Sequence, residues 1–166
     1  MKNLWFYACP IGKIGIAEQD GAICHVFFST EASPDGFTLQ ESPVIEKAER
    51  QLTEYFSGSR KTFDLPLNLG GTEFQATVWQ ALQTIPAGET RSYKDVAVMI
   101  GKPGASRAVG MANNRNPVSI IVPCHRVIGQ DGSLTGYAGG LAIKQYLLEH
   151  EKIWHAEKTH AQHTLF

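Results

Sequence analysis

Cysteine is scarce in this sequence, with three residues in 166, at the widely separated positions 9, 24 and 124. An odd number of distant cysteines argues against a disulfide framework and is typical of proteins from a reducing compartment. The spacings CxxC and HxxxH, which mark many metal sites, are absent. We therefore expect no bound metal and no other cofactor, and we interpret the histidines at positions 155, 160 and 163 as part of a solvated polar tail.

The sequence also lacks long hydrophobic runs. No stretch approaches the roughly 18 apolar residues that a membrane-spanning helix needs. The N-terminus, Met-Lys-Asn-Leu-Trp, has neither the apolar core nor the cleavage site of a signal peptide. We therefore expect a cytoplasmic protein with no membrane association. A hydrophobic content of 43% with 19% charged residues still suffices for a packed core, in one domain or two small ones.

Net charge is small, at −1, which taken alone argues against binding to nucleic acid. The distribution is uneven, because residues 90–130 contain six cations and one anion, Asp95. That segment has a net charge of +5 and leaves −6 for the rest of the chain; its cations are Arg91, Lys94, Lys102, Arg107, Arg115 and Arg126. A basic face is the electrostatic footprint of phosphate binding, and the alternative is a solvated helical surface.

The first third of the chain is predicted to be a small β-rich unit. The dipeptide Asp20-Gly21 suits the positive φ angles of a two-residue hairpin loop between two strands. Cys24 and His25 fall inside the second of these strands, and we interpret them as strand residues and not as ligands. The strand candidates are residues 4–9, 13–18 and 23–28, and a loop follows at 31–41.

A helix is predicted over residues 43–57. Ser42 is expected to cap it, and a proline follows at the first helical position. Gly58 suits the left-handed position after the last turn. Residues 61–69 contain a proline and are expected to be extended, as an edge strand or a linker. We place the domain boundary at the glycine pair that begins with Gly70.

The second half is predicted to be mainly helical. Capping-box patterns begin helices over residues 72–83 and 92–100, and a short helix covers residues 106–113. The last two are joined by a tight turn and form a helix-turn-helix, whose second helix approaches DNA. That helix has small residues and one long cation, Arg107, which indicates close contact with little reading of sequence. Packing against another helix is the alternative. A final helix is expected from residue 141 to about residue 151.

The run Ile-Ile-Val-Pro-Cys-His-Arg at residues 120–126 carries the strongest chemical signal. Its β-branched residues predict a buried strand that stops at Pro123 and presents Cys124 beside His125. A free thiol has a pKa of about 8.5, and a neighbouring base or cation lowers it. Cys124 is therefore a candidate nucleophile, and a small core cysteine is the alternative. A nucleophile just after a DNA-binding motif favours attack on a base that has been extruded from the duplex.

The sequence Pro-Cys-His-Arg-Val at residues 123–127 resembles the active-site signature of the O6-alkylguanine-DNA alkyltransferases. The resemblance extends from Ser92 to Glu151, and the form Gly-Tyr-Ala-Gly-Gly at residues 136–140 is similar to the constitutive bacterial branch. It implies an α+β fold, with an N-terminal ribonuclease-H-like α/β domain containing an antiparallel sheet, and a mostly helical C-terminal domain with a winged-helix-like helix-turn-helix. The expected ranges are residues 1–70 and 71–154, followed by the polar tail at 155–166.

The resemblance implies irreversible transfer of a methyl or other alkyl group from O6-alkylguanine in duplex DNA to Cys124, once per protein molecule, with O4-alkylthymine as a second substrate. His125 would act as base through a water molecule, and Glu151 would orient His125. Tyr93 would hydrogen-bond the guanine, and Asn116 would support the active-site turn. The other residues implied to bind the lesion or replace the flipped base are Arg107, Val127, Tyr137, Ala138, Gly139 and Lys144. A monomer is expected.

Two alternatives share this architecture without repair chemistry. One is an alkyltransferase-like lesion sensor, which lacks the cysteine, and the other is a helix-turn-helix regulator. Cys124 argues against the sensor, and the lack of a further regulatory module argues against the regulator. The chain departs from the family at Ala138, where some relatives have serine, and at residues 113–115, which are bulkier and more basic. Cys9 and Cys24 do not match the zinc ligands of the animal members.

Overall fold

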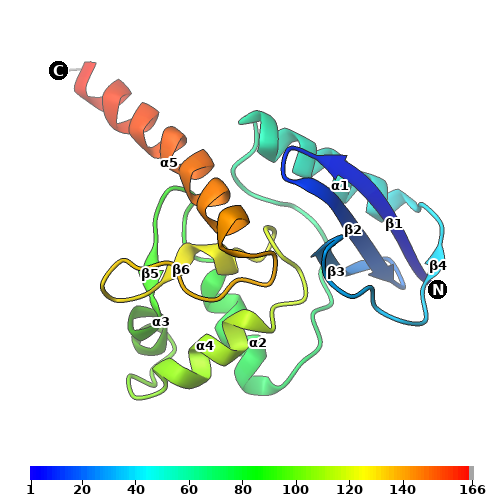
Figure 1. Ribbon diagram of the computed structural model, residues 1–166, viewed down its shortest axis with the longest axis horizontal. Coiled ribbons are helices and arrows are strands. Elements are labelled where there is room, and N and C mark those ends of the chain that lie inside the picture. Colours follow the sequence, from blue (N-terminus) through cyan, green and yellow to red (C-terminus); the bar gives the residue numbers. More distant parts are fainter. Residues whose placement is uncertain (165–166) are drawn as a thin grey trace.

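The computed structural model describes residues 1–164, with side chains through Lys152. A sheet lobe, formed by residues 1–60, lies beside a helical lobe that begins at residue 73 (Figure 1). One cluster of buried apolar side chains runs through both lobes. The predicted α+β fold, with an antiparallel N-terminal sheet and a mostly helical C-terminal part, is confirmed.

The sheet lobe is built on a meander of three antiparallel strands, β1 (Lys2–Cys9), β2 (Gly12–Gln19) and β3 (Ala22–Phe28). The predicted hairpin is confirmed, since Asp20 and Gly21 have φ angles of 52° and 86°. A two-residue strand, β4 (Thr38–Leu39), pairs parallel to β1 inside the segment predicted to be a loop. The resulting strand order is β3-β2-β1-β4.

Helix α1 (Pro43–Ser57) covers one face of this sheet (Figure 1). Both ends are as predicted, and Gly58 closes the helix in the left-handed conformation with a φ of 87°. The expected side-chain cap is wrong, because the Ser42 hydroxyl is buried and bonds no backbone N–H. The buried side chains of α1 include Ile45, Leu52 and Tyr55.

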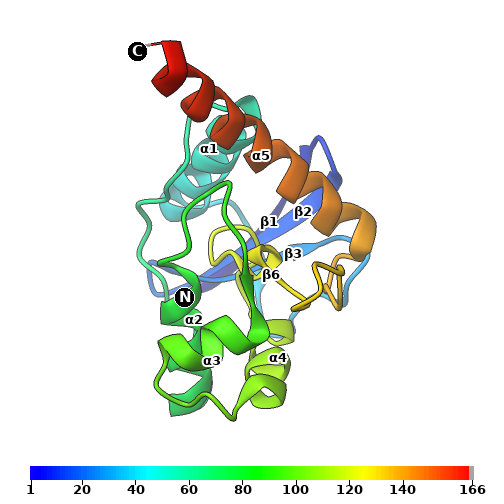
Figure 2. The same ribbon diagram turned by 90° about the vertical axis from the view of Figure 1, so that its left-hand side faces the viewer.

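The helical lobe contains α2 (Glu73–Leu82), α3 (Tyr93–Met99) and α4 (Ser106–Asn114). Both predicted capping boxes are present, at the starts of α2 and α3. The indole N–H of Trp79 donates to the Ala112 carbonyl at 2.8 Å and joins α2 to α4. Helices α3 and α4 pack together as the predicted helix-turn-helix (Figure 2).

The segment at residues 120–126 is not the predicted strand. Residue Val118 pairs with Val26 at the edge of β3, and the chain then leaves the sheet through Ile120, whose φ is 72°. Cys124–Arg126 form a short 3-10 helix, η1, that leads into β6 (Val127–Ile128). Strand β6 pairs in parallel with β5 (Arg91–Ser92), just before α3. The β-branched residues are buried in the core, so burial here does not require a sheet.

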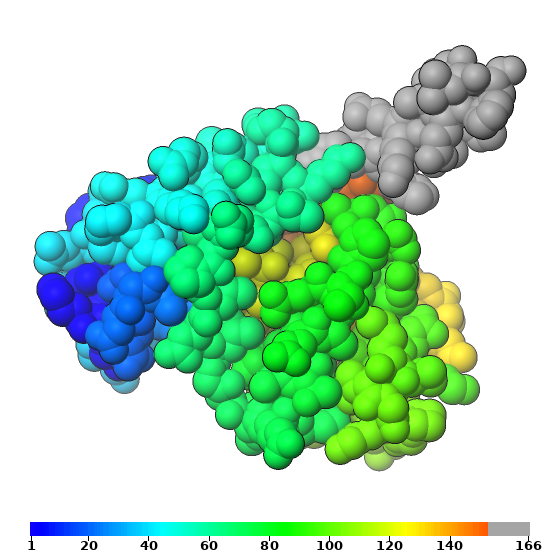
Figure 3. All heavy atoms as spheres, turned by 180° about the vertical axis from the view of Figure 1, so that it is seen from behind, coloured from blue at the N-terminus to red at the C-terminus, as the bar shows by residue number. Residues whose placement is uncertain are grey.

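The linker at residues 61–69 and the segment at residues 120–126 meet between the lobes. Residues 66–68 bond the edge of β3 at Ile23, as the extended prediction requires. A groove of about 320 Å³ separates residues 61–67 from residues 83–87, and its lining includes Ile120 and Arg126. Figure 3 shows this second segment, in yellow, at the bottom of the hollow, seen from behind.

The last helix, α5 (Leu141–Thr164), was predicted to end near residue 151 but continues through most of the predicted tail. The tail histidines, His155, His160 and His163, lie outside the residues whose side chains are described. Within the described part of the chain, no helix has the length and apolar character needed to cross a membrane.

Candidate active site

Cys124 is the first residue of η1, and its side chain is almost entirely buried, with 5% exposed. Burial raises the pKa of its thiol to about 11, although the Asn116 amide and the Lys144 charge oppose this shift. Neighbouring groups therefore act on this pKa in the predicted direction, but burial outweighs them. At neutral pH the sulfur is protonated, and an attack by Cys124 requires a base that removes the proton.

The carboxylate of Glu151 is the centre of a buried hydrogen-bond network. His125 Nε2 lies 2.7 Å from Oε2. Arg126 donates from Nε to Oε1 at 2.8 Å and from Nη2 to Oε2 at 3.1 Å. Tyr55, on α1, donates its hydroxyl to Oε2 at 2.5 Å. The structure thus places His125 and Glu151 together, as the resemblance implied, and adds two residues to the network.

The charges in this network fix which nitrogen of His125 carries a proton. Burial alone would raise the pKa of Glu151, but His125 and Arg126 outweigh it, and this pKa lies well below its usual range. A carboxylate only accepts hydrogen bonds, so His125 Nε2 is the protonated nitrogen. Burial lowers the pKa of His125 although Glu151 attracts its charged form. Nδ1 of the neutral ring is buried and has no hydrogen-bond partner among the described residues, so it is available to accept a proton.

Acidification is expected to destabilise the protein in two steps. His125 and Glu151 have folded pKa values below their ordinary values of 6.5 and 4.5, so the unfolded chain binds more protons. The stability that these two groups contribute is therefore complete above pH 6.5, falls as His125 titrates, and falls further below pH 4.5. Each group contributes up to about 1.4 kcal/mol per pH unit. Urea denaturation between pH 8 and pH 4 measures the slope.

A variant of His125 distinguishes its contribution to the pH dependence of stability from that of other titrating groups. The half-buried His25 also has a pKa lowered by burial and acts in the same direction. His125→Gln is therefore expected to reduce the loss of stability between pH 7 and pH 5 without removing it. A wild-type stability that does not change over that range would contradict the buried, neutral state of His125.

The backbone before Cys124 is held by asparagine side chains. Asn116 Nδ2 donates to the carbonyls of Val122 at 2.8 Å and Val118 at 3.3 Å, and its Oδ1 accepts from the Val118 N–H at 3.0 Å. Asn113 Nδ2 donates to the carbonyl of Cys124 at 3.3 Å. Asn116 thus lies where the resemblance placed it, at the active-site turn, and Asn113 is a further contact that the sequence did not indicate.

Several of the residues implied to form the lesion pocket contact one loop, which follows η1 and contains Thr135. Lys144 is buried and donates from Nζ to the carbonyls of Val127 and Thr135, both at 2.7 Å. Burial lowers the pKa of Lys144 to about 8. The hydroxyl of Tyr93, at the start of α3, lies 2.9 Å from Thr135 Oγ1. These contacts connect the predicted residues Tyr93, Val127 and Lys144 through one loop.

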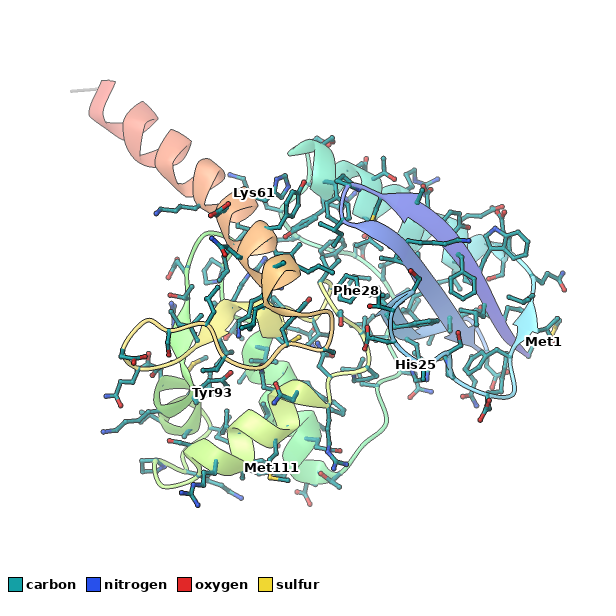
Figure 4. All side chains as sticks on the ribbon, viewed as in Figure 1. Met1, His25, Phe28, Lys61, Tyr93 and Met111 are labelled. Atoms are coloured by element: carbon teal, nitrogen blue, oxygen red, sulfur yellow. The ribbon has the colours of Figure 1, made fainter. Side chains whose placement is uncertain are left out.

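The same loop touches the sheet lobe. Phe28, labelled in Figure 4, is the last residue of β3, and its ring centroid lies 5.9 Å from that of Tyr137. A Cβ atom at Gly139 would lie 2.5 Å from the Phe28 ring, so this position requires glycine for close approach. Ala138, between them, is exposed.

The basic segment divides into buried and exposed cations. Arg126, which was counted in the predicted basic face, is 6% exposed and belongs to the Glu151 network. Arg107 is the second residue of α4 and is exposed, without an ion-pair partner among the described residues. The other exposed cations of this segment are Lys94, Lys102 and Arg115. The exposed positive charge is therefore concentrated on and beside the helix-turn-helix.

Tyr55 and Arg126 were not among the predicted site residues. Arg126 follows the candidate base His125 in a largely apolar segment. A cation in such a segment is expected to be buried and paired, and this was the signal that could have identified it. Tyr55 lies within the helix predicted over residues 43–57, where it carries no chemical signal of its own. Its partner Glu151 lies 96 positions away in the sequence, so no local pattern could have found it.

Family comparisons match both parts of the chain. Residues 5–69 match the ribonuclease-like domain of 6-O-methylguanine DNA methyltransferase, and residues 73–153 match the DNA binding domain of the same family. The methylated-DNA–protein-cysteine methyltransferase of Methanosarcina barkeri is 52% identical over 148 residues, which cover 86% of this chain and 92% of that protein. The constitutive enzyme of Bacillus subtilis is 51% identical over 156 residues, covering 90% and 94%.

Solved structures agree with these matches. The O6-methylguanine methyltransferase of Mycobacterium tuberculosis superposes with a TM-score of 0.85 at 45% identity, covering 92% of this chain and 93% of that one. A structure of the Mycobacterium tuberculosis protein OGT in complex with DNA gives the same TM-score at 47% identity, covering 90% and 92%. The family resemblance drawn from the sequence, including its likeness to a constitutive bacterial form, is confirmed.

Proposed function

Because the chain belongs to the 6-O-methylguanine DNA methyltransferase family, we propose that Cys124 is the residue that accepts the alkyl group. The activity is DNA repair by transfer of an alkyl group from DNA to a protein cysteine. The observation that carries the assignment is the buried Cys124 followed by a histidine whose Nε2 is bonded to Glu151 and whose Nδ1 has no partner among the described side chains. A lesion sensor without transfer chemistry would need neither the thiol nor the histidine.

The proposed reaction is a displacement at the alkyl carbon. The thiol proton of Cys124 passes to His125 Nδ1 through a water molecule, and Glu151 stabilises the resulting imidazolium. The sulfur–carbon bond forms as the bond between carbon and guanine O6 breaks, and the electron pair stays with guanine. Tyr93 stabilises the departing base with its hydroxyl. The product is a thioether, so each protein molecule reacts once.

We also propose how the lesion reaches Cys124. The exposed helix α4 enters the DNA groove, and Arg107 occupies the space of the extruded base. The flipped alkylguanine lies against Val127, Tyr137, Ala138 and Gly139, while Lys144 holds the pocket loop in place. The protein acts as a monomer in the cytoplasm, where the chromosome of a bacterial cell is found, and O4-alkylthymine is a second substrate.

Mass spectrometry tests the central claim. Incubation with duplex DNA that contains O6-methylguanine is expected to add one methyl group to each protein molecule, and peptide mapping is expected to place it on Cys124. The same duplex with unmodified guanine serves as the control. Tight binding to the lesion duplex with no change in protein mass would contradict the proposal and favour the sensor.

Replacement of Arg107 by alanine is expected to slow transfer from duplex DNA by about tenfold or more, since extruding a paired base costs a few kcal/mol. Transfer from free O6-benzylguanine is expected to change less than about twofold, because no base has to be extruded from a duplex. Single-turnover kinetics with both substrates measure the two effects. Arg115→Ala, an exposed cation at the other end of α4, is the matched control and is expected to affect binding without this difference. Equal losses on both substrates would exclude base extrusion as the role of Arg107.

A further inference from the structure

We infer that Tyr55, on the last turn of α1 in the sheet lobe, is a positioning residue for the transfer reaction. Its hydroxyl shares one oxygen of Glu151 with His125 and thereby sets how strongly His125 holds a proton. This inference rests on the proposed function of Cys124 and His125. It gives the sheet lobe a direct part in the chemistry of the helical lobe.

The geometry places Tyr55 in competition with His125. Oε2 of Glu151 accepts the Tyr55 hydroxyl at 2.5 Å and His125 Nε2 at 2.7 Å, and these are the two shortest bonds to that carboxylate. Arg126 contributes longer bonds, at 2.8 Å to Oε1 and 3.1 Å to Oε2. Tyr55 is fully buried, so water does not take the place of its hydroxyl.

Tyr55 can only be the donor in its bond to Glu151. Burial and the negative charge of Glu151 raise the pKa of Tyr55 far above its usual range, so the hydroxyl keeps its proton. A hydroxyl bond to a carboxylate stabilises the anion and lowers its attraction for other protons. Tyr55 therefore weakens the hold of Glu151 on the charged form of His125.

The two cations near His125 act in the same direction as the Tyr55 hydroxyl. Arg126 and Lys144 both disfavour its charged form, and Glu151 alone favours it. Loss of the Tyr55 hydroxyl would leave Glu151 less neutralised, so the pKa of His125 would rise. A larger fraction of His125 would then carry a second proton at neutral pH, and this fraction cannot accept the thiol proton of Cys124.

The ring of Tyr55 is held independently of its hydroxyl. Its centroid lies 5.3 Å from those of Phe56 and His150 and 5.7 Å from that of Phe63. The Tyr55 carbonyl also lies 2.8 Å from His150 Nε2 on α5. Tyr55→Phe therefore removes one hydrogen bond and keeps the packing between α1 and α5.

The experiment compares the pH dependence of transfer from free O6-benzylguanine in the wild type, Tyr55→Phe and Tyr7→Phe. Tyr7 is the matched control, since it is a tyrosine of the same lobe outside the Glu151 network. Tyr55→Phe is expected to react up to about threefold more slowly at pH 7 and up to about tenfold more slowly on the acid limb of its profile, which is expected about one pH unit higher. Its affinity for DNA is expected to equal that of the wild type. An unchanged profile, or an equal shift in Tyr7→Phe, would overturn the inference.

Nuclear magnetic resonance of the histidine side chains separates this inference from the proposed function. The pKa of His125 is expected to rise in Tyr55→Phe whether or not alkyl transfer occurs, whereas a wild type that forms no adduct would refute the proposed function alone. In the wild type, the Tyr55 hydroxyl proton and the proton on His125 Nε2 point at the same oxygen. A nuclear Overhauser contact between them is expected, and its absence in the folded protein would overturn the inference without any variant.

Discussion

Cys124→Ala is expected to abolish alkyl transfer and to leave the affinity for DNA unchanged. The side chain is uncharged, 5% exposed and at the start of η1, outside the helix-turn-helix, so its loss does not alter the exposed positive charges. No other residue is expected to replace the sulfur as acceptor, because the thiol is the proposed nucleophile. Intact mass after exposure to the lesion duplex and fluorescence anisotropy with the same duplex measure the two properties.

The control for this prediction is Cys24→Ala. Cys24 is also buried and free, but it belongs to β3 in the sheet lobe. This variant is expected to gain one alkyl group per molecule, as the wild type does. An adduct that persists in Cys124→Ala, or disappears in Cys24→Ala, would show that the acceptor has been assigned to the wrong cysteine.

Glu151→Gln is expected to destabilise the protein by about 3–5 kcal/mol, which is the usual cost of removing one partner of a buried ion pair. The substitution keeps the shape of the side chain but leaves the guanidinium of Arg126 buried without a counter-charge. Transfer is also expected to slow by about a hundredfold, because His125 loses the group that orients it and stabilises its charged form. Urea denaturation and single-turnover kinetics measure the two effects.

Glu149→Gln is the matched control for Glu151→Gln. Glu149 lies on the exposed side of α5 and accepts one hydrogen bond, from Gln145 at 3.1 Å. Its replacement is expected to change stability by less than about 0.5 kcal/mol, as for most surface positions. Similar losses in both variants would mean that the charge of α5, and not the buried network, determines the stability.

Elements with local determinants could be predicted closely. The hairpin depends on Asp20-Gly21, α1 on a proline at its start and Gly58 at its end, and α2 and α3 on their capping boxes. Each of these signals acts within a few residues of the element it defines. The predicted bounds of α1 are identical to those in the structure, and those of α4 differ by one residue.

The active-site segment could not be predicted in the same way. Its β-branched residues favour a strand, but the segment packs into the core against residues distant in sequence. Asn116 satisfies the backbone of Val118 and Val122 with its side chain, which removes the need for a neighbouring strand. Tertiary contacts therefore override local propensity here, and the pattern alone gave the wrong conformation for Cys124.

The candidate site also has a part that the sequence predicted and a part that depends on tertiary contacts. The motif resemblance supplied Cys124, His125, Glu151 and the pocket residues, and the structure places His125 against Glu151. Tyr55 and Arg126 complete the network through contacts that join α1, η1 and α5. These contacts depend on how distant elements pack together, and hydrophobic periodicity within one element does not predict that packing.

The raised pKa of the Cys124 thiol has a consequence for chemical selectivity. Peroxides and soluble electrophiles react with thiolates, and a buried, protonated thiol is inert toward them. The Cys124 side chain at rest is both protonated and almost inaccessible to solvent. In the proposed function, Cys124 thus stays intact among competing small reagents until a damaged base reaches it.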